Sequence, residues 1–174
     1  MGDDRMSYYR LDLLTVLVVD DDPDMSALLS DLFGALGFGR CLSAVNGEVA
    51  MTILADTEKT PVDLVITEIA MEPGDGGDLL QWIRRSLKSP NRFMPVILMS
   101  GHTDMEAMLR MRDLGVTEVL AKPLSLDRLY SVIDGLIASP RRFVESGRYF
   151  GPDRRRLEIP YRGGERRDME AEET

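Results

Sequence analysis

Short hydrophobic runs alternate with helical patterns along most of the chain. Five runs are apolar at most successive positions and rich in β-branched residues: LLTVLVV (13–19), CLSAV (41–45), VDLVIT (62–67), MPVILMS (94–100) and TEVLA (117–121). Strands of this length with few polar positions are typical of parallel sheets that are covered on both faces. The pattern therefore predicts five parallel β-strands.

Hydrophobic residues between the predicted strands recur at the i, i+3, i+4 spacing of a helix with one buried side. The clearest stripes are Met25, Leu28, Leu29, Leu32 and Leu36; Leu79, Leu80, Ile83 and Leu87; and Leu126, Leu129, Tyr130, Ile133, Leu136 and Ile137. Because consecutive strand–helix units join by right-handed crossovers, we expect an α/β fold, a doubly wound five-stranded parallel sheet of the flavodoxin-like (βα)5 type. This domain is predicted to span residues 13–139, after an N-terminal extension at residues 1–12.

The hydrophobic pattern stops at Pro140. Residues 140–174 show no sustained period and are rich in Gly, Pro and Arg, so we expect an extended C-terminal tail with little independent structure. The tail contains two copies of the pattern Tyr-x-Gly-x-acid-Arg-Arg, at residues 149–155 and 161–167. Two copies are too few for a repeat architecture, so we interpret them as a short motif used twice.

The net charge of −9 argues against a basic nucleic-acid-binding protein, but this charge is unevenly distributed. Residues 1–139 hold 12 Lys and Arg against 22 Asp and Glu, whereas residues 140–174 hold 9 Arg and no Lys against 8 acids. The average therefore hides an arginine-only tail. An anionic ligand of the tail remains a candidate, while specific DNA binding is not expected.

No hydrophobic run approaches the roughly 20 residues that span a membrane. The sequence begins with an acidic, polar stretch rather than a secretory signal, and its one cysteine, Cys41, suits a reducing compartment. We therefore expect a cytoplasmic protein without a membrane span.

Polar side chains stand where four of the predicted strands end. Asp20 and Asp21 follow the first strand, Glu68 the third, Ser100 closes the fourth and Lys122 follows the fifth. The carboxyl ends of parallel strands meet at one edge of the sheet, where open α/β sheets bind their ligands. Carboxylates suit Mg²⁺, and a hydroxyl and an ammonium opposite them could hold phosphoryl oxygens. Each of these residues alone is more typical of a turn or a helix cap than of a ligand-binding site. Together, at the ends of four strands, they predict such a site.

Four motifs carry a resemblance to a known family: VLVVDDDP (16–23), VDLVITEIAMEPGDGGDLL (62–80), VILMSGHT (96–103) and VLAKPL (119–124). Over about residues 13–139 the chain resembles the response-regulator receiver domain (CheY-like). By that resemblance Asp20, Asp21 and the acceptor position, here Glu68, would form the Mg²⁺ site. Ser100 and Lys122 would contact the phosphoryl group, and the partners would be signalling proteins such as a histidine kinase or the motility machinery.

Two positions depart from the family pattern. Glu68 stands where the family has its phospho-accepting Asp, and its carboxylate reaches about 1.5 Å further, which would crowd and weaken the Mg²⁺ site. Val119 stands where the family usually has an aromatic residue that changes rotamer on activation. Two interpretations stay open: drift in a domain retained for its shape, or a locked state in which Glu68 approximates the phosphorylated charge. The resemblance also implies a cis peptide bond before Pro123.

The tail also resembles a specific group of proteins, a subset of CheY-like proteins whose arginine-rich C-terminal tail binds cyclic di-GMP. Arginine gives bidentate hydrogen bonds to phosphate and guanine, tyrosine can stack on bases, and the acids before each Arg pair could accept from guanine N–H groups. The predicted ligand-binding residues are Arg148, Tyr149, Asp153, Arg154, Arg155, Arg156, Tyr161, Arg162, Glu165, Arg166 and Arg167.

The leading hypothesis is a non-enzymatic bacterial signal-transduction adaptor whose tail binds cyclic di-GMP and tunes partner binding. The first alternative is a stand-alone phosphorelay response regulator whose tail docks a protein partner. The tail arginines could instead pair with the acidic body, or contact RNA or a membrane surface. The domain could also act through a fixed surface of its fourth and fifth helices.

Overall fold

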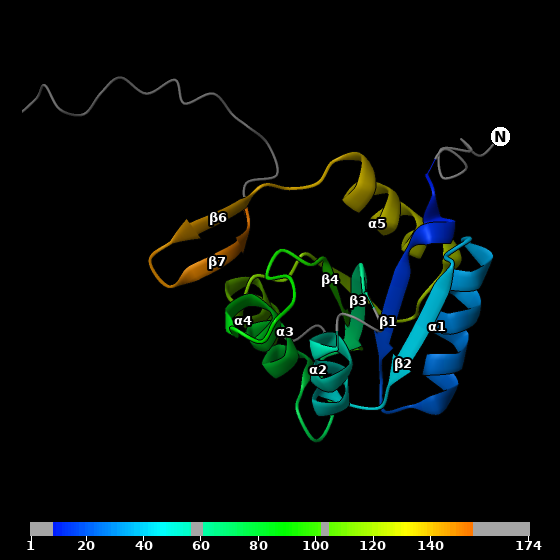
Figure 1. The fold of residues 1–174 in the computed structure, drawn as a ribbon, viewed down its shortest axis with the longest axis horizontal. Coiled ribbons are helices and arrows are strands. Elements are labelled where there is room, and N and C mark those ends of the chain that lie inside the picture. Colours follow the sequence, from blue (N-terminus) through cyan, green and yellow to red (C-terminus); the bar gives the residue numbers. More distant parts are fainter. Residues whose placement is uncertain (1–8, 57–60, 102–104, 155–174) are drawn as a thin grey trace, which may run out of the picture.

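A computed structural model describes residues 9–56, 61–101 and 105–154. Its centre is a five-stranded parallel sheet, as predicted from the hydrophobic runs, and the strand order is β2-β1-β3-β4-β5 (Figure 1). Its strands are β1 (Thr15–Val19), β2 (Arg40–Ala44), β3 (Leu64–Glu68), β4 (Val96–Ser100) and β5 (Glu118–Ala121). The order places β1 and β3 side by side, so the residues that follow them share one edge of the sheet.

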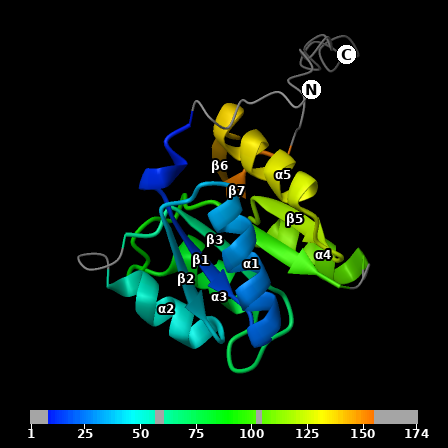
Figure 2. The same ribbon diagram turned by 90° about the vertical axis from the view of Figure 1, so that its right-hand side faces the viewer.

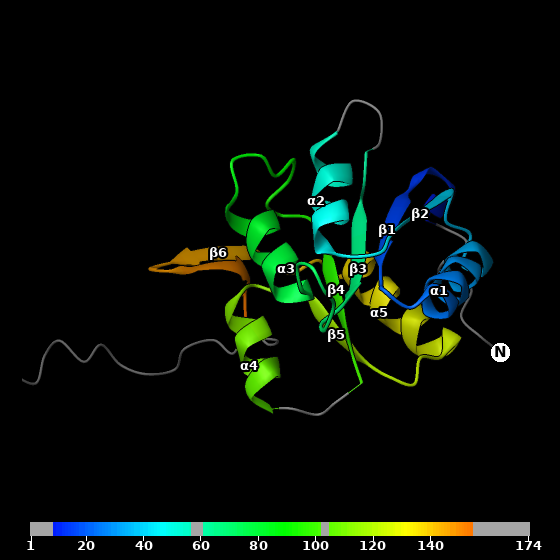
Figure 3. The same ribbon diagram turned by 90° about the horizontal axis from the view of Figure 1, so that it is seen from below.

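Helices cover both faces of the sheet. The five helices are α1 (Pro23–Ala35), α2 (Gly47–Ala55), α3 (Gly76–Arg85), α4 (Met105–Asp113) and α5 (Leu126–Ala138), and a short 3₁₀ turn lies at Leu11–Leu13. One hydrophobic cluster joins α1 and α5 to one face, and a second joins α2, α3 and α4 to the other (Figures 2 and 3). This two-sided cover confirms the doubly wound fold.

The apolar runs are explained by alternation within each strand. In β1, Val16 and Val18 belong to the cluster under α1 and α5, whereas Leu17 and Val19 belong to the cluster under α2, α3 and α4. All four side chains are fully buried. Because both faces are covered, alternation sends every second residue into a different core, and no position needs to be polar.

Three residues of the predicted helical stripes are exposed, Leu28, Leu87 and Leu126, and Leu87 departs furthest from the expected burial. Leu87 was expected on the buried side of a helix, but it is fully exposed. The physical reason is that α3 ends at Arg85, where Ser86 adopts an extended conformation and its N–H is bonded to the Trp82 carbonyl. The helical period therefore does not reach Leu87.

The region beyond Pro140 differs from the expected tail. Strands β6 (Phe143–Ser146) and β7 (Tyr149–Pro152) form an antiparallel hairpin, so the expectation of little independent structure is wrong for these residues. The turn uses Gly147 at a φ of 57°, and the Asp153 N–H donates to the Arg142 carbonyl at 2.7 Å. The boundary between domain and tail at residue 139 stays a prediction.

The hairpin packs against the receiver-like body beside α3 and α4, at the β5 end of the sheet (Figures 1 and 3). The rings of Phe143 and Phe150 each lie 5.3 Å from the ring of Phe93, which precedes β4. Edge-on aromatic pairs of this kind stabilise packing beyond the area they bury. The aromatic contacts explain why a segment without a hydrophobic period is ordered.

Candidate functional site

The carboxyl edge of the sheet brings together Asp20, Glu68 and Lys122, each supplied by the end of a different strand. The Lys122 ammonium forms an ion pair with the Glu68 carboxylate, and its Nζ lies 3.9 Å from Asp20 Oδ2. The peptide bond between Lys122 and Pro123 is cis, as the resemblance implied. The arrangement holds one ammonium between two carboxylates.

Asp20 is the buried member of this group, with 2% of its surface exposed. Its Oδ1 accepts a hydrogen bond from the Asp22 N–H at 2.9 Å, whereas its Oδ2 has no hydrogen-bond partner among the described residues. Burial raises the pKa of the Asp20 carboxyl, although the Asp22 N–H and the Lys122 ammonium oppose this rise. Asp20 is therefore a carboxyl group whose charge is only partly compensated.

Glu68 is held from two sides. One carboxylate oxygen, Oε1, accepts from the Ile69 N–H at 2.8 Å, and the other meets Lys122. Burial by itself would lower the pKa of Lys122, but the hydrogen bond and charge of Glu68, helped by Asp20, outweigh burial and raise it. Both partners of the ion pair are mostly shielded from solvent, with 13% and 26% of their side chains exposed.

The other two predicted pocket residues lie at the rim. Asp21 is exposed and lines a shallow depression of about 510 Å³ with Glu72 and Asp75. Ser100 is half-buried at the end of β4, and its carbonyl accepts from the Lys122 N–H at 2.8 Å. Asp21 is therefore exposed to solvent at the edge of the sheet. Ser100 is connected to Lys122 through a backbone hydrogen bond.

The Mg²⁺ site expected from Asp20, Asp21 and Glu68 stays a prediction. Within residues 9–56, 61–101 and 105–154, no group of three or more His, Cys, Asp and Glu side chains is placed to hold a metal ion. The Glu68 carboxylate is occupied by an ammonium and a backbone N–H instead.

Val119, where the resemblance implies an aromatic residue, is half-buried and packs against the cluster under α2, α3 and α4. It also lines a groove of about 380 Å³ between α4, β5 and the hairpin. Three arginines and a tyrosine line this groove together with apolar side chains, and we call it the arginine groove. Its lining includes Arg112, Arg141, Tyr149 and Arg154, the apolar residues Met108, Leu109, Val116, Val119 and Pro152, and the polar residues Thr117 and Glu118.

The arginine groove carries an excess of positive charge. Asp113 accepts from both Arg112 and Arg154, at 3.2 and 3.1 Å, and Glu118 pairs with Arg141 at 3.0 Å. The Arg154 guanidinium also lies 4.0 Å from the centre of the Tyr149 ring. Two carboxylates therefore face three guanidinium groups, and a planar arginine stacks on an aromatic ring.

The predicted tail residues divide into two sets. Among those described, Tyr149 and Arg154 line the groove, whereas Arg148 is exposed beyond it and Asp153 closes the hairpin through its N–H. The remaining predicted residues lie outside the described part of the chain: Arg155, Arg156, Tyr161, Arg162, Glu165, Arg166 and Arg167.

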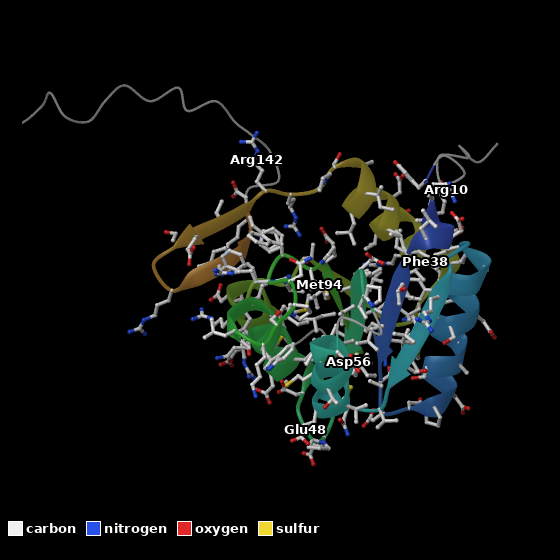
Figure 4. The ribbon with its side chains drawn as sticks, viewed as in Figure 1. Arg10, Phe38, Glu48, Asp56, Met94 and Arg142 are labelled. Carbon is white, nitrogen blue, oxygen red and sulfur yellow. The ribbon has the colours of Figure 1, made fainter. Side chains whose placement is uncertain are left out.

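Sequence reasoning missed two arginines of the groove. Arg141 stands at the start of the arginine-rich segment, and that position was an available signal. Arg112 carries no such signal, because its place in the groove depends on the hairpin docking beside α4. Arg142, next to Arg141, is exposed and its side chain points away from the domain (Figure 4).

Comparison with known proteins agrees with this geometry. The family model "Response regulator receiver domain" matches residues 16–134. "Probable chemotaxis protein CheY" of Rhizobium etli is 32% identical over 127 residues, which cover 72% of this chain and 94% of that protein. "Probable cyclic di-GMP phosphodiesterase" of Vibrio cholerae is 32% identical over 127 residues, but the match covers only 27% of that protein.

Solved structures show the same fold. A response regulator receiver protein from Pseudomonas putida superimposes with a TM-score of 0.59 at 32% identity, over 70% of this chain and 95% of that one. Among the described residues, no helix has the length and apolar character needed to cross a membrane. The match over residues 16–134, the strand order and the residues at the sheet edge show that the chain belongs to the response regulator receiver domain family.

Proposed function

We propose that the protein is a non-enzymatic signal-transduction adaptor. Its receiver domain is held in one state by Glu68, and its arginine-rich tail binds cyclic di-GMP and thereby tunes the binding of a signalling partner. The observation that carries the proposal is the arginine groove, in which the first Tyr-x-Gly-x-acid-Arg-Arg copy meets the surface of α4 and β5.

The ion pair between Lys122 and Glu68 supports the proposal that Glu68 holds the receiver domain in one state. By the resemblance, the family's lysine at this position contacts the phosphoryl group on the acceptor aspartate. In this chain the Glu68 carboxylate supplies a permanent negative charge to that lysine. A carboxylate already bonded to an ammonium and a backbone N–H is poorly placed to accept a phosphoryl group.

The ligand is supported by the chemistry of the groove. Guanidinium groups bind phosphate and guanine through two parallel hydrogen bonds, and tyrosine offers a stacking face. Cyclic di-GMP presents two guanines and two phosphates. Because the groove is shared between the hairpin and α4, a ligand that bridges them would change the surface that this side of the domain offers to a partner.

Calorimetry with cyclic di-GMP on the full chain tests the proposal. The parent is expected to bind at micromolar concentration, and replacing Arg154, Arg155 and Arg156 by alanine should weaken binding at least about tenfold. The matched control is Arg128→Ala, an exposed arginine at the start of α5 outside the groove, which should bind like the parent. No heat of binding, or equal affinity of the two variants, would contradict the ligand.

A second candidate function is a stand-alone response regulator in a phosphorelay. The observation that favours it is the match to 94% of the length of a chemotaxis protein. The pairs of Arg154 with Asp113 and Arg141 with Glu118 would then serve to dock the tail on the body. Phosphotransfer at position 68 distinguishes the two functions.

A further inference from the structure

A second arginine-rich pocket lies apart from the arginine groove, on the loop that joins α3 to β4. It has a volume of about 520 Å³, and we call it the loop pocket. None of the described residues that line it is acidic. Its polar lining consists of Arg84, Arg85, Ser86, Ser89, Asn91 and Arg92.

The innermost residue of the loop pocket is Arg84, with 1% of its surface exposed. Its guanidinium donates to four neutral oxygens, the carbonyls of Gly115, Arg92 and Met94 and the Thr117 hydroxyl, at 2.7 to 3.2 Å. Figure 4 shows Met94 inside the body of the domain. Burial lowers the pKa of Arg84 to about 10, so the group stays charged at neutral pH. In the described part of the chain no carboxylate pairs with this charge.

Two further donors in the loop pocket find no acceptor in the described part of the chain. Arg92 Nε and Ser89 Oγ are both buried, and neither has a hydrogen-bond partner within the described residues. Among the residues that the structure describes, Glu145 is the only carboxylate paired with Arg92, at 3.5 Å, and its side chain is 68% exposed. Exposed pairs contribute little, whereas buried donors without acceptors are costly and uncommon.

We infer that the loop pocket binds a phosphoryl group. Phosphate is the anion whose several oxygens match this donor set, since it can accept from a hydroxyl and from planar guanidinium groups at once. Ser89 Oγ and Arg92 Nε supply the two inner donors, and Arg85 supplies charge at the rim. A bound phosphate neutralises a pocket in which three arginines crowd together.

The same arginines hold the hairpin, so this site is coupled to the tail. The Arg92 guanidinium lies 3.4 Å from the centre of the Phe150 ring, and that of Arg84 lies 5.0 Å from the Phe143 ring. Arg85 donates to the Arg148 carbonyl in the hairpin turn. A phosphoryl ligand that reduces the repulsion among these cations therefore stabilises the docked hairpin.

The test is a titration of the isotopically labelled full chain with inorganic phosphate at constant ionic strength, followed by NMR. The Arg92 Nε–H and Ser89 amide signals should shift and saturate, and Ser89→Ala should weaken binding about tenfold. Ser43→Ala, an exposed serine on β2, is the matched control and should leave the affinity unchanged. Chloride should cause no saturable shift.

Three outcomes would overturn the inference. They are shifts that grow linearly without saturation, shifts that chloride reproduces, and equal phosphate affinity of Ser89→Ala and the parent. Because Ser89→Ala removes a single oxygen, it is not expected to unfold the protein. The test of cyclic di-GMP binding replaces Arg154, Arg155 and Arg156, whereas the phosphate test replaces Ser89. Either proposal can therefore fail without the other.

Discussion

The ammonium of Lys122 forms an ion pair with the carboxylate of Glu68, the residue that the resemblance aligns with the phospho-accepting aspartate of the receiver family. The two residues come from the ends of β5 and β3, with β4 between them in the sheet. Asp20, on the other side of the ammonium, completes a compact charged group. In the proposed function, Glu68 supplies from the polypeptide itself the negative charge that a receiver domain gains on phosphorylation.

Shortening residue 68 should restore the acceptor. Glu68→Asp withdraws the carboxylate by about 1.5 Å and loosens its pair with Lys122. We expect this variant to become labelled by acetyl phosphate in the presence of Mg²⁺, whereas the parent does not, as measured by intact-protein mass spectrometry. Glu72→Asp makes the same change at an exposed acid and should stay unlabelled.

Labelling of the parent would show that the pair does not block phosphotransfer. If neither the parent nor Glu68→Asp is labelled, the pocket has lost more than its acceptor. That result would contradict the locked state and favour the other interpretation, sequence drift in a domain retained for its shape.

Removal of Arg84 should destabilise the protein severely. Arg84→Ala leaves three carbonyls and a hydroxyl without their donor, and we expect the free energy of unfolding to fall by about 3 kcal/mol or more. Arg85→Ala, at the adjacent exposed position, should cost less than about 1 kcal/mol. Equilibrium denaturation with urea measures both values, and equal losses would contradict the role of Arg84.

Gly115 should be required for docking of the hairpin. It has a φ of 87°, and a Cβ at this position would collide with the Phe150 carbonyl. Gly115→Ala should therefore destabilise the protein by more than about 1 kcal/mol and expose β6 to amide hydrogen exchange. Gly135→Ala in α5 meets open space and should stabilise the protein by up to about 1 kcal/mol. A neutral Gly115→Ala variant would show that the hairpin does not pack as described.

Asp20 should make the protein less stable as the pH rises. Its pKa is raised in the folded protein, chiefly by burial, so the folded state holds this proton more tightly than the unfolded chain. Stability then declines from about pH 4 upward, through the pKa of the folded state. Asp20→Asn removes this decline, so its free energy of unfolding should fall less between about pH 4 and 7.

Denaturation of the parent and Asp20→Asn across this range measures the difference in slope. Asp31→Asn, an exposed carboxylate on α1, is the matched control and should follow the parent. A slope of Asp20→Asn equal to that of the parent would show that the surrounding charges compensate Asp20 fully.

The sequence by itself determined the five parallel strands and the polar residues at their carboxyl ends. The run TVLVV is apolar at four of five positions because both faces of β1 are covered, and this local signal is enough to predict a parallel strand. The chain order of Asp20, Glu68 and Lys122 then places them at strand ends. The family motifs that contain these three residues independently indicate the same positions at the strand ends.

Only the tertiary structure decided which charges are buried and what the tail does. Arg84 and Arg85 are neighbours of the same type, yet one is fully buried and the other exposed, because helix α3 turns them toward different surroundings. The hairpin of β6 and β7 has no hydrophobic period of its own and is held through Phe93, about fifty residues earlier in the chain. Such long-range contacts depend on how the elements pack, and no local pattern encodes them.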